Sequence, residues 1–121
     1  MGLDIYFHKR KFGEEIGYFR KVNFLVKYFE DKGMDVENQT PLQVDKEMIE
    51  ELYSRCCKVL NNHEDAEELL PTCEGFFFGS TEYDEYYFDN VKNVKEYIEE
   101  ILLPIFDDLQ PDEYITFDTW Y

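Results

Sequence analysis

Basic residues are scarce in this sequence. Only twelve Lys and Arg stand against twenty-eight Asp and Glu in 121 residues, which gives a formal net charge of −16 at pH 7. The imbalance is uneven, because residues 1–32 carry a net charge of +2 and the rest carries −18. A field of this sign repels nucleic-acid phosphates and anionic membranes, and it favours cationic partners, metal ions or plain solubility. We therefore expect no direct nucleic-acid or membrane binding, and a basic protein as the partner.

Cysteine and histidine are scarce as well. Cys56 and Cys57 are adjacent, where a disulfide would be strained, and no pair of cysteines has C-x-x-C spacing. This usage is typical of a reducing cytosol. The two histidines, His8 and His63, have no Cys or His at the spacing of a zinc site. The acidic side chains leave Ca²⁺ or Mg²⁺ open without fixing any ligand, so we expect no metal site and no cofactor.

Long apolar runs are missing too. No run approaches the roughly 20 residues that a helix needs to cross a bilayer. The chain opens on "LDIYFHK" with no basic-then-apolar leader, and position 6 is Tyr rather than the Ser or Thr of a myristoylation signal. We therefore expect a cytoplasmic protein.

Aromatic residues, by contrast, are plentiful, with 11 Phe, 10 Tyr and 1 Trp. Together with a hydrophobic fraction of 44%, they supply enough apolar surface for a real core. The length suits one domain and leaves little room for two. We therefore expect residues 1–121 to fold as a single domain.

Two stretches, residues 3–9 and 114–121, alternate between apolar and polar side chains. This alternation is typical of half-buried strands. The polar faces carry Asp4, Tyr6 and His8 in the first stretch and Tyr114, Thr116, Asp118 and Trp120 in the second.

Three stretches repeat apolar residues at helical spacing. The first predicts a long helix over residues 14–33 that is apolar on more than one side. The second covers residues 48–60 behind an N-cap at Asp45, and the third covers residues 91–105 behind an N-cap at Asp89.

Shorter signals punctuate the chain between these helices. Residues 34–44 have the composition of a loop, and residues 64–70 form a short helical piece that Pro71 ends. Pro104 should kink or end the third long helix, because proline cannot donate a backbone hydrogen bond.

The segment "CEGFFFGSTEYDEYYFDN" has one clear half and one ambiguous half. Its apolar run between glycines predicts a strand covered on both faces, with Phe76 to Phe78 in the core. The second half fits a helical turn opened by a capping box of Thr81 and Asp84. It fits equally a return strand that places Tyr83 and Tyr87 on one face.

The order of these elements indicates the fold class. Strands at both ends enclose helices and one or two further strands, without repeats, linkers or low-complexity tracts. We expect a small α+β domain with an antiparallel or mixed sheet of three to four strands and about three main helices packed on one face.

Three segments carry a resemblance to a known family. "MGLDIYFHKRK", "EIGYFRKVN" and "LLPTCEGFFFGSTEYDEYYF" resemble a family of small proteins found in bacteriophages and in bacterial genomes, often as prophage or mobile-element genes. The resemblance covers most of the chain and is most specific over residues 69–88. It implies a bacterial cytoplasm or a phage gene as the context, and it implies no activity, because none is established for the family.

A cluster of hydroxyls, carboxylates and tyrosines follows Gly79 and is the candidate site. Its groups are of the kind that bind an anion or a metal ion, or act as acid and base. They are equally what a turn and a helix cap require. Arg20 and Asn23 lie on the polar side of the first predicted helix and could join them. The candidate residues are Arg20, Asn23, Ser80, Thr81, Tyr83, Asp84, Glu85 and Tyr86.

Three functions remain open at this stage, and with them the question of whether the protein is an enzyme. The first is an acidic protein that binds a basic partner, in one version by mimicking the charge of nucleic acid. The second is a small ligand-binding protein or enzyme with its site at the cluster after Gly79. The third is a homodimeric structural protein with Phe24 and Tyr28 at the subunit contact. Tyrosines and the tryptophan favour interfaces but also line core edges; they are Tyr83, Tyr86, Tyr87, Tyr114, Trp120 and Tyr121.

Overall fold

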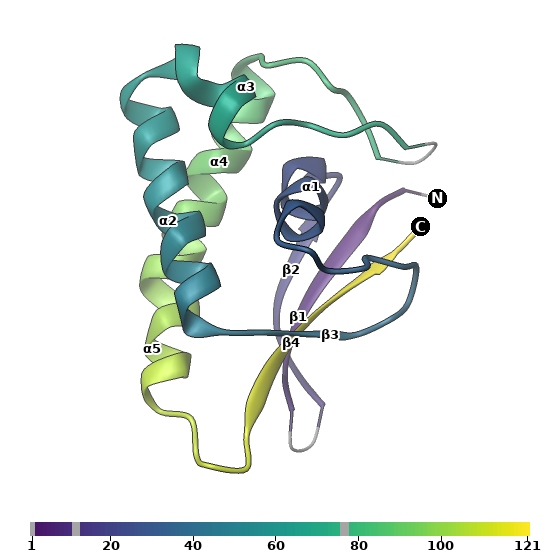
Figure 1. Cartoon of the computed structure of the whole chain (residues 1–121), viewed down its shortest axis with the longest axis vertical. Coiled ribbons are helices and arrows are strands. Elements are labelled where there is room, and N and C mark those ends of the chain that lie inside the picture. The colour runs from purple at the N-terminus through teal and green to yellow at the C-terminus, as the bar shows by residue number, and fades with distance from the viewer. Residues whose placement is uncertain (1, 11–12, 76–77) are drawn as a thin grey trace.

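An antiparallel sheet organises the computed structural model, which describes residues 2–10, 13–75 and 78–121 (Figure 1). Its four strands stand in the spatial order β2-β1-β4-β3. The strands nearest the two ends of the chain, β1 and β4, therefore lie side by side in the centre. The strands are β1 (Asp4–Arg10), β2 (Glu14–Arg20), β3 (Leu42–Val44) and β4 (Tyr114–Trp120).

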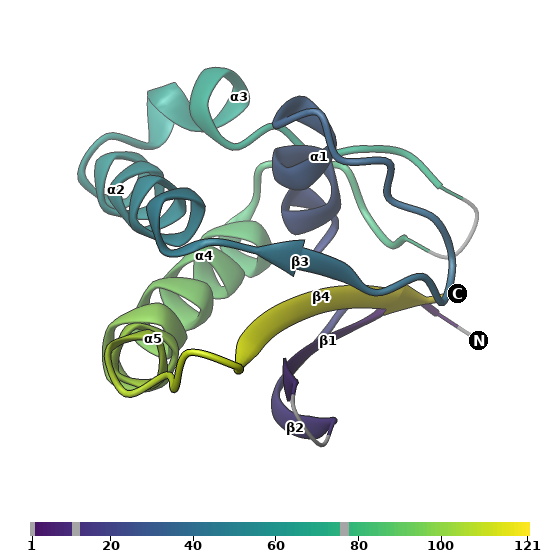
Figure 2. The ribbon, with the colours of Figure 1, turned by 60° about the horizontal axis from the view of Figure 1, so that its bottom comes forward.

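Helices cover one side of this sheet, and the other side has no helix on it among the described residues (Figure 2). A 3₁₀ turn, His63–Asp65, precedes α3, and a π-helical segment, Ile98–Leu102, joins α4 to α5. The predicted α+β class with helices on one face of a sheet is confirmed. The helices are α1 (Asn23–Asp31), α2 (Lys46–Asn61), α3 (Ala66–Leu69), α4 (Glu85–Tyr97) and α5 (Leu103–Asp107).

The prediction of one long helix over residues 14–33 is wrong in its first half. That half is β2, which pairs antiparallel with β1. Tyr18 and Phe19 fit one arc of a helix, yet on the strand they point to opposite faces, with Tyr18 exposed and Phe19 packed against the core. Gly17 is the residue of this segment that argues against a helix, because glycine in a helix interior lowers stability by about 1 kcal/mol relative to alanine. Gly13, with a φ of +75°, supplies a left-handed residue just before β2.

The second half of that prediction is correct, and it forms α1. This helix is buried on most sides, and its Tyr28 hydroxyl donates a hydrogen bond of 2.6 Å to the carbonyl of Met48. Phe24 and Tyr28 are each only 2% exposed. The homodimer contact predicted at these two residues is therefore wrong, since both side chains belong to the core.

The helix predicted behind Asp45 is confirmed as α2. The Asp45 carboxylate accepts a hydrogen bond of 2.8 Å from the Met48 backbone N–H, as an N-cap does. Cys56 lies on the buried stripe of α2 and is fully covered. The short helical piece before Pro71 is confirmed as well, whereas the predicted loop over residues 34–44 contains the short strand β3.

The strand predicted over "CEGFFFG" is wrong wherever the structure describes it; Phe76 and Phe77 lie outside the described residues. Phe78 lies in a bend, and its backbone N–H donates a hydrogen bond of 3.0 Å to the carbonyl of Gly75. The Phe78 ring occupies the space that a side chain at position 75 would need. Gly79 follows with a φ of +87°. These features make a turn, which apolarity alone does not reveal.

The ambiguous half of the segment leads into a helix. The α4 helix begins after Asp84, whose carboxylate accepts a hydrogen bond of 3.0 Å from the Tyr87 N–H. The predicted cap at Asp89 is therefore wrong, because Asp89 lies inside the helix. Pro104 sits in the first turn of α5, just after the π-helical segment, and the helical path continues to Asp107.

The core lies between the helices and the inner face of the sheet. Phe7 on β1 and Phe117 on β4 are at most 2% exposed and face each other across the two central strands. Phe29 from α1 packs against Phe117 with ring centroids 4.5 Å apart and the rings tilted by 40°. Since alternate side chains of a strand point to opposite faces, these contacts fix which residues the uncovered face presents.

Candidate functional site on the open face of the sheet

The uncovered face, called the open face from here on, carries rows of polar and aromatic side chains across β2, β1 and β4. Tyr6 stands between Tyr18 and Asp118, and the next row places His8 between Glu15 and Thr116. A third row places Asp4 between Arg20 and Trp120. Three large aromatic side chains on this face are exposed to solvent: Tyr18 at 47%, Tyr114 at 42% and Trp120 at 49%.

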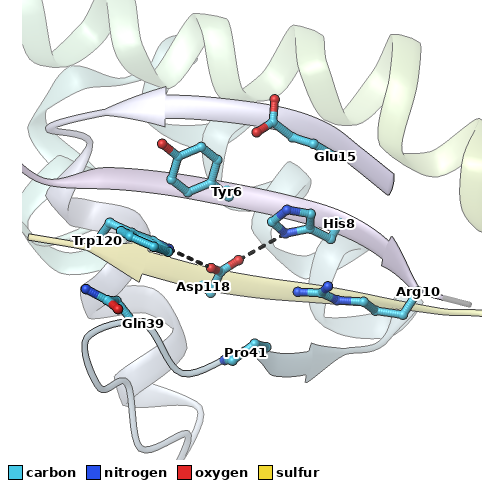
Figure 3. Close-up of a pocket in the computed structure, with 8 residues that line it drawn as sticks. All are labelled: Tyr6, His8, Arg10, Glu15, Gln39, Pro41, Asp118 and Trp120. Atoms are coloured by element: carbon cyan, nitrogen blue, oxygen red, sulfur yellow. Dashed lines mark hydrogen bonds and ion pairs between the residues drawn. The ribbon is translucent and has the colours of Figure 1, made fainter. Parts of the chain in front are cut away.

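Asp118 is the buried centre of this face. Its side chain is covered although it lies on the open side, and both of its oxygens have partners (Figure 3). His8 Nδ1 lies 3.1 Å from Oδ1, and Trp120 Nε1 donates 3.2 Å to Oδ2. An ionised carboxylate only accepts hydrogen bonds, so a hydrogen bond from His8 to Asp118 requires a proton on Nδ1. The two contacts of the Asp118 carboxylate therefore hold the His8 imidazole and the Trp120 indole in fixed orientations.

A pocket of about 460 Å³ opens over this centre. That volume falls within the roughly 300–1,000 Å³ typical of small-ligand sites. Gln39, which also lines the pocket, has a φ of +61°. Residues other than glycine rarely adopt this backbone conformation, and those that do cluster at functional sites. The pocket is lined by Tyr6, His8, Arg10, Glu15, Gln39, Pro41, Asp118 and Trp120 (Figure 3).

Carboxylates dominate the electrostatics around Tyr6. Burial and the nearby charges of Asp4, Glu15 and Asp118 raise the pKa of the Tyr6 hydroxyl above its ordinary value of 10.0. The lining residue with a permanent positive charge is Arg10, whose Nε donates a hydrogen bond of 3.1 Å to the Thr116 hydroxyl.

The pocket contains a group that can exchange protons. An imidazole oriented by a carboxylate can act as acid or base at its second nitrogen, Nε2. None of the eight lining residues is Ser, Thr or Cys. The oriented imidazole therefore suits ligand binding or proton transfer.

The negative charge of the protein is segregated away from this face. Residues 45–113, which form α2 to α5 and the turns between them, hold twenty Asp and Glu against five Lys and Arg, a net charge of −15. The remainder, which contains the whole sheet, carries −1. The molecule thus has an acidic helical side and a nearly neutral sheet.

Asn23, predicted at the site, is a structural anchor. Its side chain is 3% exposed, and its amide donates to the carbonyls of Phe78 at 3.1 Å and Ser80 at 3.0 Å. Its carbonyl oxygen accepts from the Cys73 N–H at 3.3 Å. The polar groups of Asn23 are thereby used in holding the turn around Gly79 against α1.

Several groups of the predicted cluster bond within the chain. The Ser80 hydroxyl accepts from the Glu82 N–H at 3.0 Å, and the Thr81 carbonyl accepts from the Thr72 hydroxyl at 3.0 Å. The Tyr83 hydroxyl accepts a hydrogen bond of 3.1 Å from the Thr72 N–H. These contacts are those of a folded turn before a helix.

The structure brings only part of the predicted site together. Asn23, Ser80, Asp84 and Tyr86 line a hollow of about 20 Å³, too small for an organic ligand. Tyr83 and Glu85 line a separate pocket with Asp84, beside the stacked rings of His63 and Phe88. Arg20 lies on the open face opposite Asp4, so it does not join the others.

The open-face residues that sequence reasoning did not place in a site are Tyr6, His8, Glu15 and Asp118, whereas Arg20, Tyr114 and Trp120 had been named as candidates. The sequence did contain a signal for this face. The alternation in residues 3–9 placed Tyr6 and His8 on a polar strand face, and the alternation in residues 114–121 did the same for Asp118 and Trp120. The pairing of the two strands, which brings residues 110 positions apart into contact, was not readable from one sequence.

The chain matched none of the protein-family models, curated proteins or solved structures with which it was compared. Among the described residues, no group of three or more His, Cys, Asp and Glu is placed to hold a metal ion. Within those residues, no helix has the length and apolarity needed to cross a membrane.

Proposed function

We propose that the protein is an interaction protein that binds a basic protein partner through the open face of its sheet. The observation that carries this proposal is the exposure of Tyr18, Tyr114 and Trp120 on a sheet face that no described helix covers. Tyr and Trp are enriched in the centres of protein interfaces, where they bury large areas at low entropic cost. The context that fits the sequence resemblance is a phage or mobile-element gene acting in a bacterial cell.

The acidic helical side has a separate role in this proposal. A net charge of −15 over residues 45–113 creates a long-range field that attracts a basic partner and speeds its encounter. Charges outside the contact act mainly on the association rate, whereas buried aromatic contacts act mainly on the dissociation rate. The two surfaces therefore affect different kinetic constants.

The test begins with native mass spectrometry of the protein captured gently from a bacterial lysate. The expected result is a co-purifying basic polypeptide that Trp120→Ala loses and Tyr86→Ala retains. Tyr86 is the matched control, because it is 56% exposed but lies on α4, away from the open face. Retention of the partner by Trp120→Ala and by Tyr18→Ala would contradict the proposal.

Salt provides the second arm of the test. Raising the salt from 0.1 M to 0.5 M shortens the screening length from about 10 Å to about 4 Å, so the association rate should fall. Replacement of Glu64, Glu67 and Glu68 by Gln should lower the association rate and leave the dissociation rate unchanged. An association rate that is independent of salt would remove the electrostatic part of the proposal.

A further inference from the structure

The pocket in the open face has aromatic walls that are held in place. The indole N–H of Trp120 is fixed on the buried Asp118 carboxylate, which sets the orientation of the ring. Tyr6 lines the same pocket and packs against Tyr18, with the two ring centroids 5.2 Å apart. Faces of aromatic rings attract organic cations, most strongly when the ring is that of Trp.

A carboxylate that forms no ion pair among the described residues stands near Tyr6. Glu15 is exposed at the pocket wall, directly across from His8, and within the described part of the chain it forms no ion pair. Asp118 differs, because both of its oxygens are already bonded. Glu15 is therefore the carboxylate that an incoming cation can neutralise.

Arg10, which carries the permanent positive charge of the pocket lining, lies at the end opposite Trp120 (Figure 3). Arg10 is tied by its Nε to Thr116, and its Nη1 lies beside Gly13, 3.1 Å from where a Cβ would be. His8 contributes a positive charge only when it is protonated. Around Tyr6, burial and the charges of Asp4, Glu15 and Asp118 together raise the pKa of its hydroxyl.

We propose that this pocket, which Trp120 also lines, receives the guanidinium group of an arginine side chain, carried by the basic partner, between the ring of Tyr6 and Glu15. Guanidinium suits the pocket better than ammonium, because it is planar, stacks on aromatic rings and offers two parallel donors to a carboxylate. This inference rests on the proposed function for the source of the arginine. The recognition itself can be tested without any partner.

The sequence provides a built-in reporter, because Trp120 is the only tryptophan of the chain. The probe is N-acetyl-L-arginine amide, titrated into the full-length protein while Trp120 fluorescence is followed. The neutral analogue N-acetyl-L-citrulline amide has the same shape without the charge, and N-acetyl-L-glutamate amide carries the opposite charge. We expect a saturable change with the arginine probe, and binding weaker by about tenfold with citrulline, as a desolvated cation–π contact implies.

Two variants locate the site. Glu15→Gln should weaken the arginine probe by about three- to fivefold, the range for a partly exposed ion pair. Glu14→Gln is the matched control, since it removes the same charge from the neighbouring residue on the other face of the strand, and it should leave binding unchanged. Tyr6→Leu, which keeps the reporter, should weaken the probe by about threefold through loss of a ring face.

Three results of the probe titrations would overturn the inference. They are equal binding of citrulline and arginine, tighter binding of the glutamate probe, and absence of a saturable signal while the protein is folded by circular dichroism. An unchanged affinity in Glu15→Gln would overturn it as well. If a partner binds the open face but the arginine probe does not bind, the proposed function stands and this inference is wrong. If the probe binds but no partner depends on the open face, the pocket recognises arginine and the proposed function is wrong.

Discussion

A side chain at Gly17 would collide with Tyr97, because a Cβ atom there would lie 2.3 Å from the Tyr97 hydroxyl oxygen. Gly17 lies on the edge strand β2, and the Tyr97 hydroxyl donates a hydrogen bond of 3.1 Å to the carbonyl of the preceding residue, Ile16. The end of α4 is thereby seated directly on the backbone of β2.

This contact makes Gly17→Ala a sensitive test of the fold. We expect the free energy of unfolding in urea to fall by about 1–3 kcal/mol, as in other overpacked sites. In a Tyr97→Leu background, which removes the ring, the same substitution should cost much less. Additive costs in the double variant would show that the two residues do not meet as described.

Replacement of the buried amide Asn23 by Asp should loosen the turn around Gly79. The change removes two donors and leaves a buried carboxylate facing the carbonyls of Phe78 and Ser80, so we expect a loss of about 2–4 kcal/mol. Hydrogen exchange should accelerate over residues 72–83. Asn93→Asp, an identical change at an exposed position of α4, is the control and should alter neither quantity. Normal protection of residues 72–83 in Asn23→Asp would refute this role.

Asp118→Asn should disturb the open face without unfolding the protein. The amide can accept from His8 or from Trp120 but not from both, so we expect a loss of about 1–2 kcal/mol in urea denaturation. Trp120 fluorescence should shift, because its N–H loses a charged acceptor. Asp35→Asn, at an exposed position, serves as control. An unchanged emission spectrum would mean that the indole is not held by Asp118 in solution.

Stability should fall at alkaline pH, through the buried thiol of Cys56. Burial raises its pKa from the ordinary value of 9.0 to about 12. A pKa that is higher in the folded state gives stability that is complete below pH 9 and declines as the pH rises toward 12, by up to about 1.4 kcal/mol per pH unit for one group.

Burial also raises the pKa of the tyrosines Tyr28, Tyr87 and Tyr97, which adds to this decline above pH 10. The measurement is urea denaturation at pH 8 to 12, with Cys56→Ala to remove the thiol contribution and Cys57→Ser as control. A denaturation midpoint that stays constant up to pH 12 would be inconsistent with a buried neutral thiol.

The sequence predicted an element correctly where its apolar residues fitted either the helical period or the alternation of a strand, but not both. The alternation around Phe7 and Phe117 predicted the two central strands, and the stripe behind the Asp45 cap predicted α2. Residues 14–20 fitted the helical period, and a register shift between Phe7 and His8 interrupts the alternation of the strand that they form. The contact between Gly17 and Tyr97 spans 80 positions of sequence. Local pattern could not reveal it.

The candidate site was harder to predict for a related reason. The polar cluster after Gly79 was dense enough to attract attention, but turns and caps need the same residue types, and the structure uses them in that way. The open face combines residues that looked unremarkable singly, such as His8 and Asp118. Only the pairing of β1 with β4 brings them to 3.1 Å.

The pairing of Asp4 with Trp120 places the two ends of the described chain side by side (Figure 1). Any peptide fused to either end, such as an affinity tag, begins within a few residues of Trp120 and can cover the surface under study. Capture experiments should therefore use a tag that is cleaved off, or one inserted in the turn between α5 and β4, at the opposite end of β4. The same proximity makes the fold suitable for circular permutation, because a short linker can join the two ends.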